Sequence, residues 1–473
     1  MQPRTRKGGL ATFVVAGAVV VAGAGGARAD YVLEGLPSAS VGYTDNARLV
    51  PPSMNPVSDE FGVIAGTARA HLRQGNADHS LGLRMSDTFY FHGRGPMALS
   101  MELAWLSELR LSAPTQMRLG ASLAYGQSST PTGVDVAGGA TAQSGLTSRY
   151  VSLGATEELV HQVGKRSRVL QSFRFAGMHY LRSFLDFTTS VVVGANARAE
   201  REFGQNLLSV EADVADNITP GVVGASDQLL LAQALAGWRR DLGLAWWVQL
   251  KAGALGILDF HGTQVLEPAA LAEVTYRRIY WFATLSGAQT ATANLFIGAA
   301  TISDQAALRL ALPLARSERF FLVGYGGYTY ARLFDDTGTH RAYELRTAGA
   351  SFTARGERLP IWASLEYTYS RQFGNGNDLS TAIRIDDLER QTVMLTVGGA
   401  FVHGAAPPPI FHGVLPGAVP LGESRPEDAG RSPEDLPAPT GNGEPGAGGA
   451  GSSQTGSGQS SGQGSGNVKN VPR

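Results

Sequence analysis

Long segments in which apolar and polar residues strictly alternate dominate the middle of this 473-residue chain. The alternation is clearest over residues 99–105, 117–125, 208–214 and 361–369. A period of two is typical of extended strands with one apolar and one polar face. The strands run for about ten residues or more between connections, which exceeds the roughly five or six of globular sheets and matches what a tilted strand needs to cross a bilayer. The pattern therefore favours strands that span a membrane.

The connections between these strands are of two kinds, which alternate along the chain. Eight are short, charged turns near residues 74–76, 112–114, 164–166, 203–205, 240–242, 277–278, 316–318 and 355–357. Nine are longer or more acidic loops near residues 50–58, 92–97, 127–144, 181–186, 217–226, 259–263, 294–303, 335–339 and 374–387. Strict alternation of eight and nine connections predicts eighteen strands. The weakest strand predictions are 228–239 and 320–331, where the two faces are not cleanly separated.

Physical chemistry then limits the fold. Lipid cannot hydrogen-bond to backbone polar groups, so a membrane-spanning sheet must close into a barrel. An even strand count, with short turns at one end and longer loops at the other, is typical of outer-membrane barrels. A propeller would show repeats of about 40–50 residues, and a soluble sandwich would have shorter strands. The sequence predicts an all-β transmembrane antiparallel up-and-down β-barrel of about 18 strands in the cell outer membrane.

The two ends of the chain differ from the barrel segment. Arg4, Arg6 and Lys7 precede an apolar run at 10–24 and then Ala27-Arg28-Ala29, a pattern typical of a cleaved secretory signal. The last part is rich in Pro, Gly and Ser and cannot bury a core, so it is predicted to be disordered. The expected organisation is a signal peptide at 1–29, the barrel at 30–403 and a disordered tail at 404–473.

The alternation also predicts which charged side chains face the lumen. The apolar face must meet lipid, so the polar face lines the interior. The predicted pore-lining residues are Arg84, Glu102, Arg118, Arg174, Arg198, Glu211, Asp213, Arg309, Glu344, Arg346 and Glu366. These charges either pair across strands and stiffen the wall, or form a hydrophilic track for a polar, extended substrate. The two interpretations are compatible, and a barrel of this size is wide enough for an aqueous channel.

Several other classes of function are excluded or unsupported. The chain has no cysteine, so it has no disulfide, thiolate metal site or cysteine nucleophile, and a formal net charge of −1 argues against a nucleic-acid partner. None of its nine histidines forms an H-E-x-x-H motif. A G-x-S-x-G match at 458–462 lies in low-complexity sequence without the strand–turn–helix context of a nucleophile elbow. We therefore predict no catalytic residue, no metal site and no cofactor.

One local motif carries a resemblance to a known family. The segment Ser40-Val41-Gly42-Tyr43-Thr44-Asp45-Asn46 is followed by a loop with Pro51, Pro52 and Pro56, and then by Ser58-Asp59-Glu60-Phe61-Gly62. This resembles the opening hairpin of outer-membrane β-barrel porins associated with exopolysaccharide secretion. In that family a G-Y-x-D-N first strand leads through a Pro-bearing loop to a second strand that starts with S-D.

The resemblance implies a conduit that exports an exopolysaccharide together with a periplasmic or inner-membrane export complex. The expected partners are outer-membrane lipid and lipopolysaccharide, the barrel-insertion machinery, that export complex and the polysaccharide. One feature departs from the family: its barrels usually end at a terminal aromatic, whereas here Phe401 of such a strand is followed by the long tail. The alternatives are a passive diffusion porin for small polar solutes, a structural surface barrel and a barrel hydrolase.

Overall fold

The computed structural model describes most of the predicted barrel segment. The described residues are 30–404, except 49, 96, 129–147, 183–188, 220–227, 244, 260–263, 279–280, 295–298, 315–318, 335–340, 357–359 and 375–386. The predicted signal peptide at 1–29 and the predicted tail, from residue 405 onward, lie outside the described residues.

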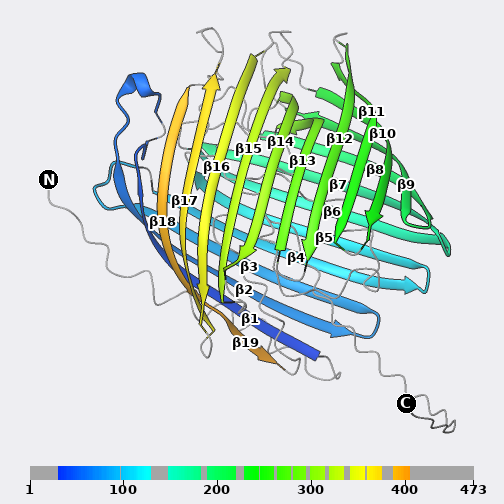
Figure 1. Ribbon diagram of the computed structural model, residues 1–473, viewed down its shortest axis with the longest axis horizontal. Helices are drawn as coiled ribbons and strands as arrows, with labels where there is room; N and C mark the ends of the chain where they lie inside the picture. The colour runs from blue at the N-terminus through cyan, green and yellow to red at the C-terminus, as the bar shows by residue number, and fades with distance from the viewer. Residues whose placement is uncertain are drawn as a thin grey trace, which may run out of the picture.

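The described residues form nineteen strands and one short 3-10 helix (Figure 1). In chain order they are β1 Asp30–Thr44, η1 Pro52–Met54, β2 Asp59–Gln74, β3 Ala77–Tyr90, β4 Ala98–Ser112, β5 Thr115–Ser128, β6 Ser148–Gly164, β7 Ser167–Arg182, β8 Thr189–Phe203, β9 Asn206–Ile218, β10 Gln228–Leu242, β11 Trp246–Asp259, β12 Gln264–Arg278, β13 Trp281–Asn294, β14 Ala299–Pro313, β15 Phe320–Phe334, β16 Arg341–Arg355, β17 Ile361–Gly374, β18 Leu388–Gly399 and β19 Phe401–Gly404. Most are 14 to 16 residues long, which is more than a bilayer crossing requires.

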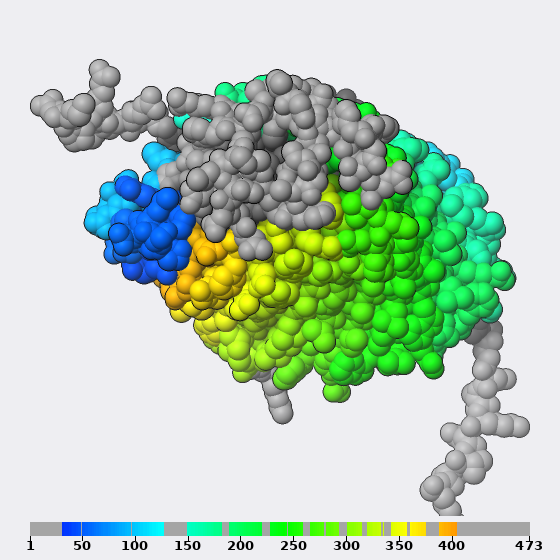
Figure 2. All heavy atoms as spheres, turned by 90° about the horizontal axis from the view of Figure 1, so that it is seen from above, coloured from blue at the N-terminus to red at the C-terminus, as the bar shows by residue number. Residues whose placement is uncertain are grey.

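The sheet closes on itself. Each of the strands β1 to β17 pairs antiparallel with the next one in sequence, and β1 pairs with β18 from Ser38↔Gly398 to Thr44↔Thr392. Figure 2 shows the two ends of the barrel segment, blue and orange, side by side. β19 follows β18 after Ala400 and extends the same pairing to β1, with Gly35 opposite Phe401. The eighteen-stranded up-and-down barrel that the sequence predicts is confirmed.

The two ends of the barrel differ as the loop lengths predict. At one end the strands are joined by turns as short as two residues, such as Gly75-Asn76 and Gly204-Gln205. Gly75 and Gly204 have φ of 58° and 62°, the positive φ that two-residue hairpins of the type II′ class require at their first central residue. The longer connections lie at the other end, where the segment with η1 stands at the top left of Figure 1. We call these the turn end and the loop end.

The register gives every strand one apolar face that is exposed around the outside. Val210, Leu285 and Leu365 are 64, 57 and 50% exposed, and the residues beside them in neighbouring strands are also apolar. Side chains of the opposite parity, such as Glu211 and Glu366, face the interior. A closed barrel with an exposed apolar outer face is suited to lipid on the outside and to polar contents within.

Among the described strands, the longest interruption of the wall lies between β12 and β13 near the loop end. The ladder of these two strands ends at Ala270↔Gln289. Residues 264–269 of β12 continue to pair with β11, and residues 290–294 of β13 continue to pair with β14, but these two segments do not pair with each other. Pro268 lies in the interrupted part, and proline cannot donate to a ladder. We call this interruption the seam.

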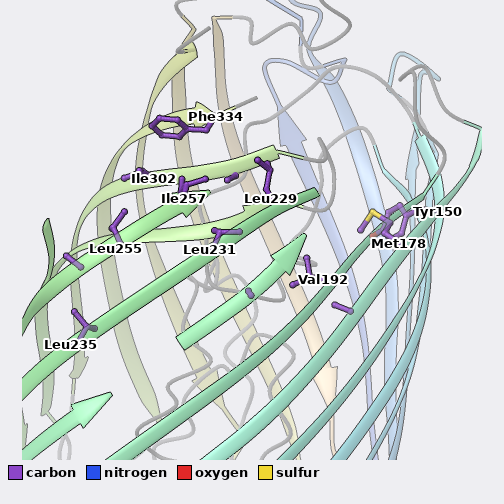
Figure 3. Packing of buried hydrophobic residues seen from close by; sticks show 14 of the residues in the cluster. Tyr150, Met178, Val192, Leu229, Leu231, Leu235, Leu255, Ile257, Ile302 and Phe334 are labelled. Atoms are coloured by element: carbon purple, nitrogen blue, oxygen red, sulfur yellow. The ribbon is translucent and has the colours of Figure 1, made fainter. Parts of the chain in front are cut away.

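Beyond the seam the loop ends of β13 to β15 turn into the barrel. Leu255 and Ile257 point inward from β11, yet they share one buried cluster with Ile302 of β14 and Phe334 of β15, whose parity would otherwise place them on the outer face. Figure 3 shows Ile302 and Phe334 beside Ile257 and Leu229. We call this group the inner apolar cluster, and its members are Tyr150, Ala176, Met178, Tyr180, Val192, Ala215, Leu229, Leu231, Leu235, Leu255, Ile257, Ala269, Ala300, Ile302 and Phe334.

Candidate functional site

The inner wall of the barrel is the candidate site. Nine of the eleven residues predicted to line the pore lie on the inward face by register: Arg84, Glu102, Arg118, Arg174, Arg198, Glu211, Asp213, Arg309 and Glu366. Their position follows from the strand alternation. Whether they line a conducting path stays a prediction.

The prediction that Glu344 and Arg346 line the pore is wrong. They lie on the outward face of β16, because they share the parity of Phe352, which is opposite the exposed Leu365 of β17. The inward residue of this segment is Tyr343, which is 1% exposed. The alternation predicted the wrong face because Tyr343 is a residue type expected to face lipid. The two charged side chains lie near the loop end of the outer face, where lipid headgroups replace hydrocarbon.

The first group of inward charges joins three neighbouring strands near the turn end. Arg118 of β5 lies in register between Glu108 of β4 and Glu158 of β6. Its Nε is 2.9 Å from Glu108 Oε1, and its Nη1 donates to Glu158 Oε1 at 3.3 Å. One guanidinium thereby links two carboxylates, which fixes all three side chains against the wall.

A second pair reaches across an intervening strand. Arg174 of β7 donates to both carboxylate oxygens of Asp213 of β9, at 2.9 and 2.7 Å. The strand between them, β8, has Gly194 at this row. A Cβ at Gly194 would lie 2.7 Å from Arg174 Nε, so only glycine leaves room for the arginine to lie flat over β8. Asn196 Nδ2 also donates to Glu211 Oε1 at 3.0 Å.

The same arrangement recurs two strands further on. Lys251 Nζ of β11 is 2.9 Å from Glu211 Oε2 of β9, and β10 between them has Gly237 in register with Lys251. A Cβ at Gly237 would lie 3.1 Å from Lys251 Cγ. Glycines on the inner wall thus let long charged side chains lie flat and pair.

Two buried charges lie side by side on the inward face of β8. Arg198 and Glu200 are 5 and 3% exposed, and Glu200 forms ion pairs with Arg198 and with Arg168 of β7. Buried carboxylates are stable only when cations and hydrogen bonds compensate them. Here two cations flank one carboxylate, and Glu211 lies opposite Arg198 in register.

Together these residues form a band that we call the charge belt. Its members are Glu108, Arg118, Glu158, Arg168, Arg174, Arg198, Glu200, Glu211, Asp213 and Lys251. Five are cations and five are anions, so the belt is strongly polar but balanced in charge. The sequence prediction missed Glu108, Glu158, Arg168, Glu200 and Lys251. The same alternation could have found them, since each stands between outward-facing neighbours.

The remaining inward residues lie outside the belt. Arg84 of β3 is opposite Glu102 of β4 in register. Arg309 of β14 lies over the ring of Phe282 at 5.9 Å, and Glu366 of β17 is 3% exposed. The structure thus brings five of the predicted residues together in the belt, on β5 to β9, and leaves these four apart from it.

Three further observations concern the described part of the barrel. A hollow of about 630 Å³ lies on the outer face along β10 to β13, at the row just below the seam, and the outward-facing Ala252, Ala270 and Gly287 are among the residues that line it. Among the residues that the structure describes, no three histidine, aspartate or glutamate side chains gather as they would around a metal ion. Within the same residues, no helix is long and apolar enough to cross a membrane.

Comparisons with known proteins were made for sequence and for fold. No family profile matches the chain, and no curated protein is similar to it in sequence. The FrpB iron transporter from Neisseria meningitidis (F3-3 variant) is similar in structure, with a TM-score of 0.44, 9% identity and coverage of 79% of this chain and 81% of that chain. The siderophore receptor PirA from Pseudomonas aeruginosa has a TM-score of 0.43, 8% identity and coverage of 78 and 80%. OccAB2 from Acinetobacter baumannii has a TM-score of 0.43, 10% identity and coverage of 79 and 98%.

These likenesses name no substrate for this chain. In this chain eighteen strands close into a barrel, and the outward side chains form an exposed apolar surface. Such a wall is stable only with lipid around it. The chain is an outer-membrane β-barrel.

Proposed function

We propose that the barrel is an outer-membrane conduit for a polar, extended solute, and that this solute is an exopolysaccharide moved toward the cell surface. The observation that carries the proposal is the charge belt, in which every member has an ion-pair partner of opposite sign. A lining of paired charges offers many hydrogen-bonding groups and little net field. That combination suits a hydroxyl-rich chain better than it suits a single class of ion.

Hydroxyl side chains extend the polar lining beyond the belt. Ser86 and Ser100 share a hydrogen bond of 2.7 Å, Ser40 and Thr396 one of 2.8 Å, and Thr353 donates to Ser364 at 3.1 Å. These pairs lie on the inward faces of β1, β3, β4 and β16 to β18. The polar contacts therefore continue around much of the circumference, as a track for an uncharged sugar chain requires.

The resemblance of the first hairpin supports the same substrate class. The structure places Asn46 of that motif at the loop end, where its side chain donates to Val50 O at 2.8 Å and to Glu389 O at 2.9 Å. Asp59 accepts from the backbone N–H of His92 and of Arg94. The motif residues thus order the first loop at the mouth of the barrel, which gives the motif a structural role compatible with a conduit.

Gene deletion with an assay of extracellular polysaccharide tests the proposal. We expect loss of secreted polymer, with restoration by the wild-type gene and by an Arg346→Gln variant, whose change is on the outer face. Unchanged polymer together with reduced uptake of small sugars would establish the alternative, a passive diffusion porin. Unchanged polymer and unchanged uptake would point to a structural surface barrel.

A further inference from the structure

The seam between β12 and β13 costs free energy in a wall that faces lipid. Each backbone N–H and C=O that would have paired across it lacks its ladder partner, and hydrocarbon cannot replace that partner. Elsewhere neighbouring strands pair along most of their length, for example from Asp30↔Arg73 to Thr44↔Asp59 between β1 and β2. An interruption of this kind needs a physical reason beyond closure of the barrel.

The outer lip of the seam is in contact with the lipid phase. Leu266 of β12 is 80% exposed, the highest value among the large apolar side chains of the described residues. Its neighbours along the same face, Pro268 and Ala270, are also exposed. An acyl chain of the surrounding bilayer is therefore the molecule that meets the seam from outside.

Apart from Glu267, the inner side of the seam is apolar, in contrast to the charge belt. Ala269 of β12 belongs to the inner apolar cluster, together with Ile257 and Ile302, and Val265 packs against that cluster. On β17, by contrast, the inward residues toward the loop end are the polar Thr368, Ser370 and Gln372. Apolar surface thus continues from the lipid side of the wall, through the interruption, to the interior.

A polar contact spans the seam and holds it closed. Glu267 of β12 accepts from Nη1 and Nη2 of Arg332 of β15 at 2.7 and 2.5 Å, and from Gln289 Nε2 of β13 at 3.3 Å. We call these three residues the latch. The latch ties the inward-turned strands to β12 by side chains in place of backbone pairing, and side-chain contacts can separate without unzipping a ladder.

We propose that the seam is a lateral opening through which the acyl chain of an outer-leaflet lipid reaches the inner apolar cluster. The latch closes the opening, and the hollow just below the seam gives space at its base. This site is separate from the proposed polysaccharide path, since it is apolar and lies in the wall. The proposal holds whatever solute passes along the charge belt.

Photolabelling tests the route directly. The full chain is placed in nanodiscs of phosphatidylcholine that carries a diazirine near the end of one acyl chain, and adducts are mapped by mass spectrometry. We expect adducts on outward residues such as Leu250 and also on Ile257 and Ile302. Inward residues far from the seam, such as Thr353, should stay unlabelled. Adducts confined to outward residues would overturn the proposal.

A cross-linked variant separates the seam from entry through the barrel mouth. The chain has no cysteine, so Glu267→Cys with Arg332→Cys can be bridged by a short bis-maleimide without side reactions. Bridging should lower the labelling of Ile257 several-fold and leave that of Leu250 unchanged. Equal inner labelling with and without the bridge would exclude the seam as the route. Should that variant fail to fold, Glu267→Gln is used, and its inner labelling must exceed that of the wild type.

Discussion

Arg332 of β15 and Glu267 of β12 form a two-point ion pair, at 2.7 and 2.5 Å, although two strands lie between them in the sheet. Their side chains are 26 and 20% exposed, so solvent screens the pair only in part. The contact is possible because the loop ends of β13 to β15 turn inward. It is the clearest sign that the barrel is not a simple cylinder at its loop end.

Loss of this ion pair should lower stability. Arg332→Gln leaves a partly buried carboxylate without its cation, and the expected cost is about 1–3 kcal/mol. The measurement is guanidinium unfolding in detergent micelles, followed by tryptophan fluorescence. The matched control is Arg346→Gln, which breaks the exposed pair of Arg346 with Glu344 at 3.1 Å on the outer face. That change should leave the free energy of unfolding nearly unchanged. Equal effects of the two variants would contradict a stabilising role for the ion pair of Arg332 with Glu267.

Substitution of Gly194 should disturb the arginine that lies over it. A Cβ at Gly194 meets Arg174 Nε at 2.7 Å and Cγ at 3.0 Å, so Gly194→Val must displace the side chain from Asp213. We expect a loss of about 1–3 kcal/mol, measured by the same unfolding assay. Gly66→Ala is the control, because a Cβ there meets nothing within 4 Å. A neutral Gly194→Val would show that Arg174 does not depend on the glycine.

Removal of one belt charge should change ion selectivity. Asp213→Asn leaves the belt with one cation in excess, so reversal potentials in planar bilayers should shift toward anions, whereas Arg174→Gln should shift them toward cations. The shifts should shrink as salt is raised, because the Debye length falls from about 10 Å at 0.1 M to about 3 Å at 1 M. Arg346→Gln should leave selectivity unchanged. Shifts of the same sign for both inner variants would argue against a path along the belt.

Truncation within the inner apolar cluster should be costly. Ile302 is 0% exposed, so Ile302→Ala leaves a cavity, and the expected loss is about 2–5 kcal/mol. Leu285→Ala on the outer face, where the side chain is 57% exposed, should cost much less because lipid refills the space. The unfolding midpoints of the two variants measure this difference in stability. Similar losses would indicate that Ile302 meets lipid and that β14 does not turn inward.

Backbone exchange gives an independent view of the seam. Residues 265–269 of β12 have no ladder partners on β13, so the N–H groups among them that point to that side are unpaired, whereas residues 271–276 are paired with both neighbouring strands. We expect faster deuterium exchange in the first segment than in the second. The corresponding rows of β17, paired on both sides, serve as a reference. Uniform protection along β12 would show a ladder that is continuous in solution.

The sequence by itself determined the barrel. A period of two fixes which side chains share a face, and short turns that alternate with longer loops fix the strand number, because both are local properties of an extended chain. The same reasoning placed Arg118, Arg174 and Glu211 on the inward face. It failed at Glu344 and Arg346, where apolar and charged residues stand on both parities and the local pattern cannot choose between them.

Tertiary structure alone decided the pairing of charges and the shape of the loop end. Nothing in the sequence says that Arg174 meets Asp213 across Gly194, since the two are 39 residues apart and only the register brings them together. The strand at 228–239 had no clear polar face for a related reason. Its inward residues Leu229, Leu231 and Leu235 are apolar because strands far along the chain turn in and pack on them. Long-range packing, which no local period encodes, overrides the alternation there.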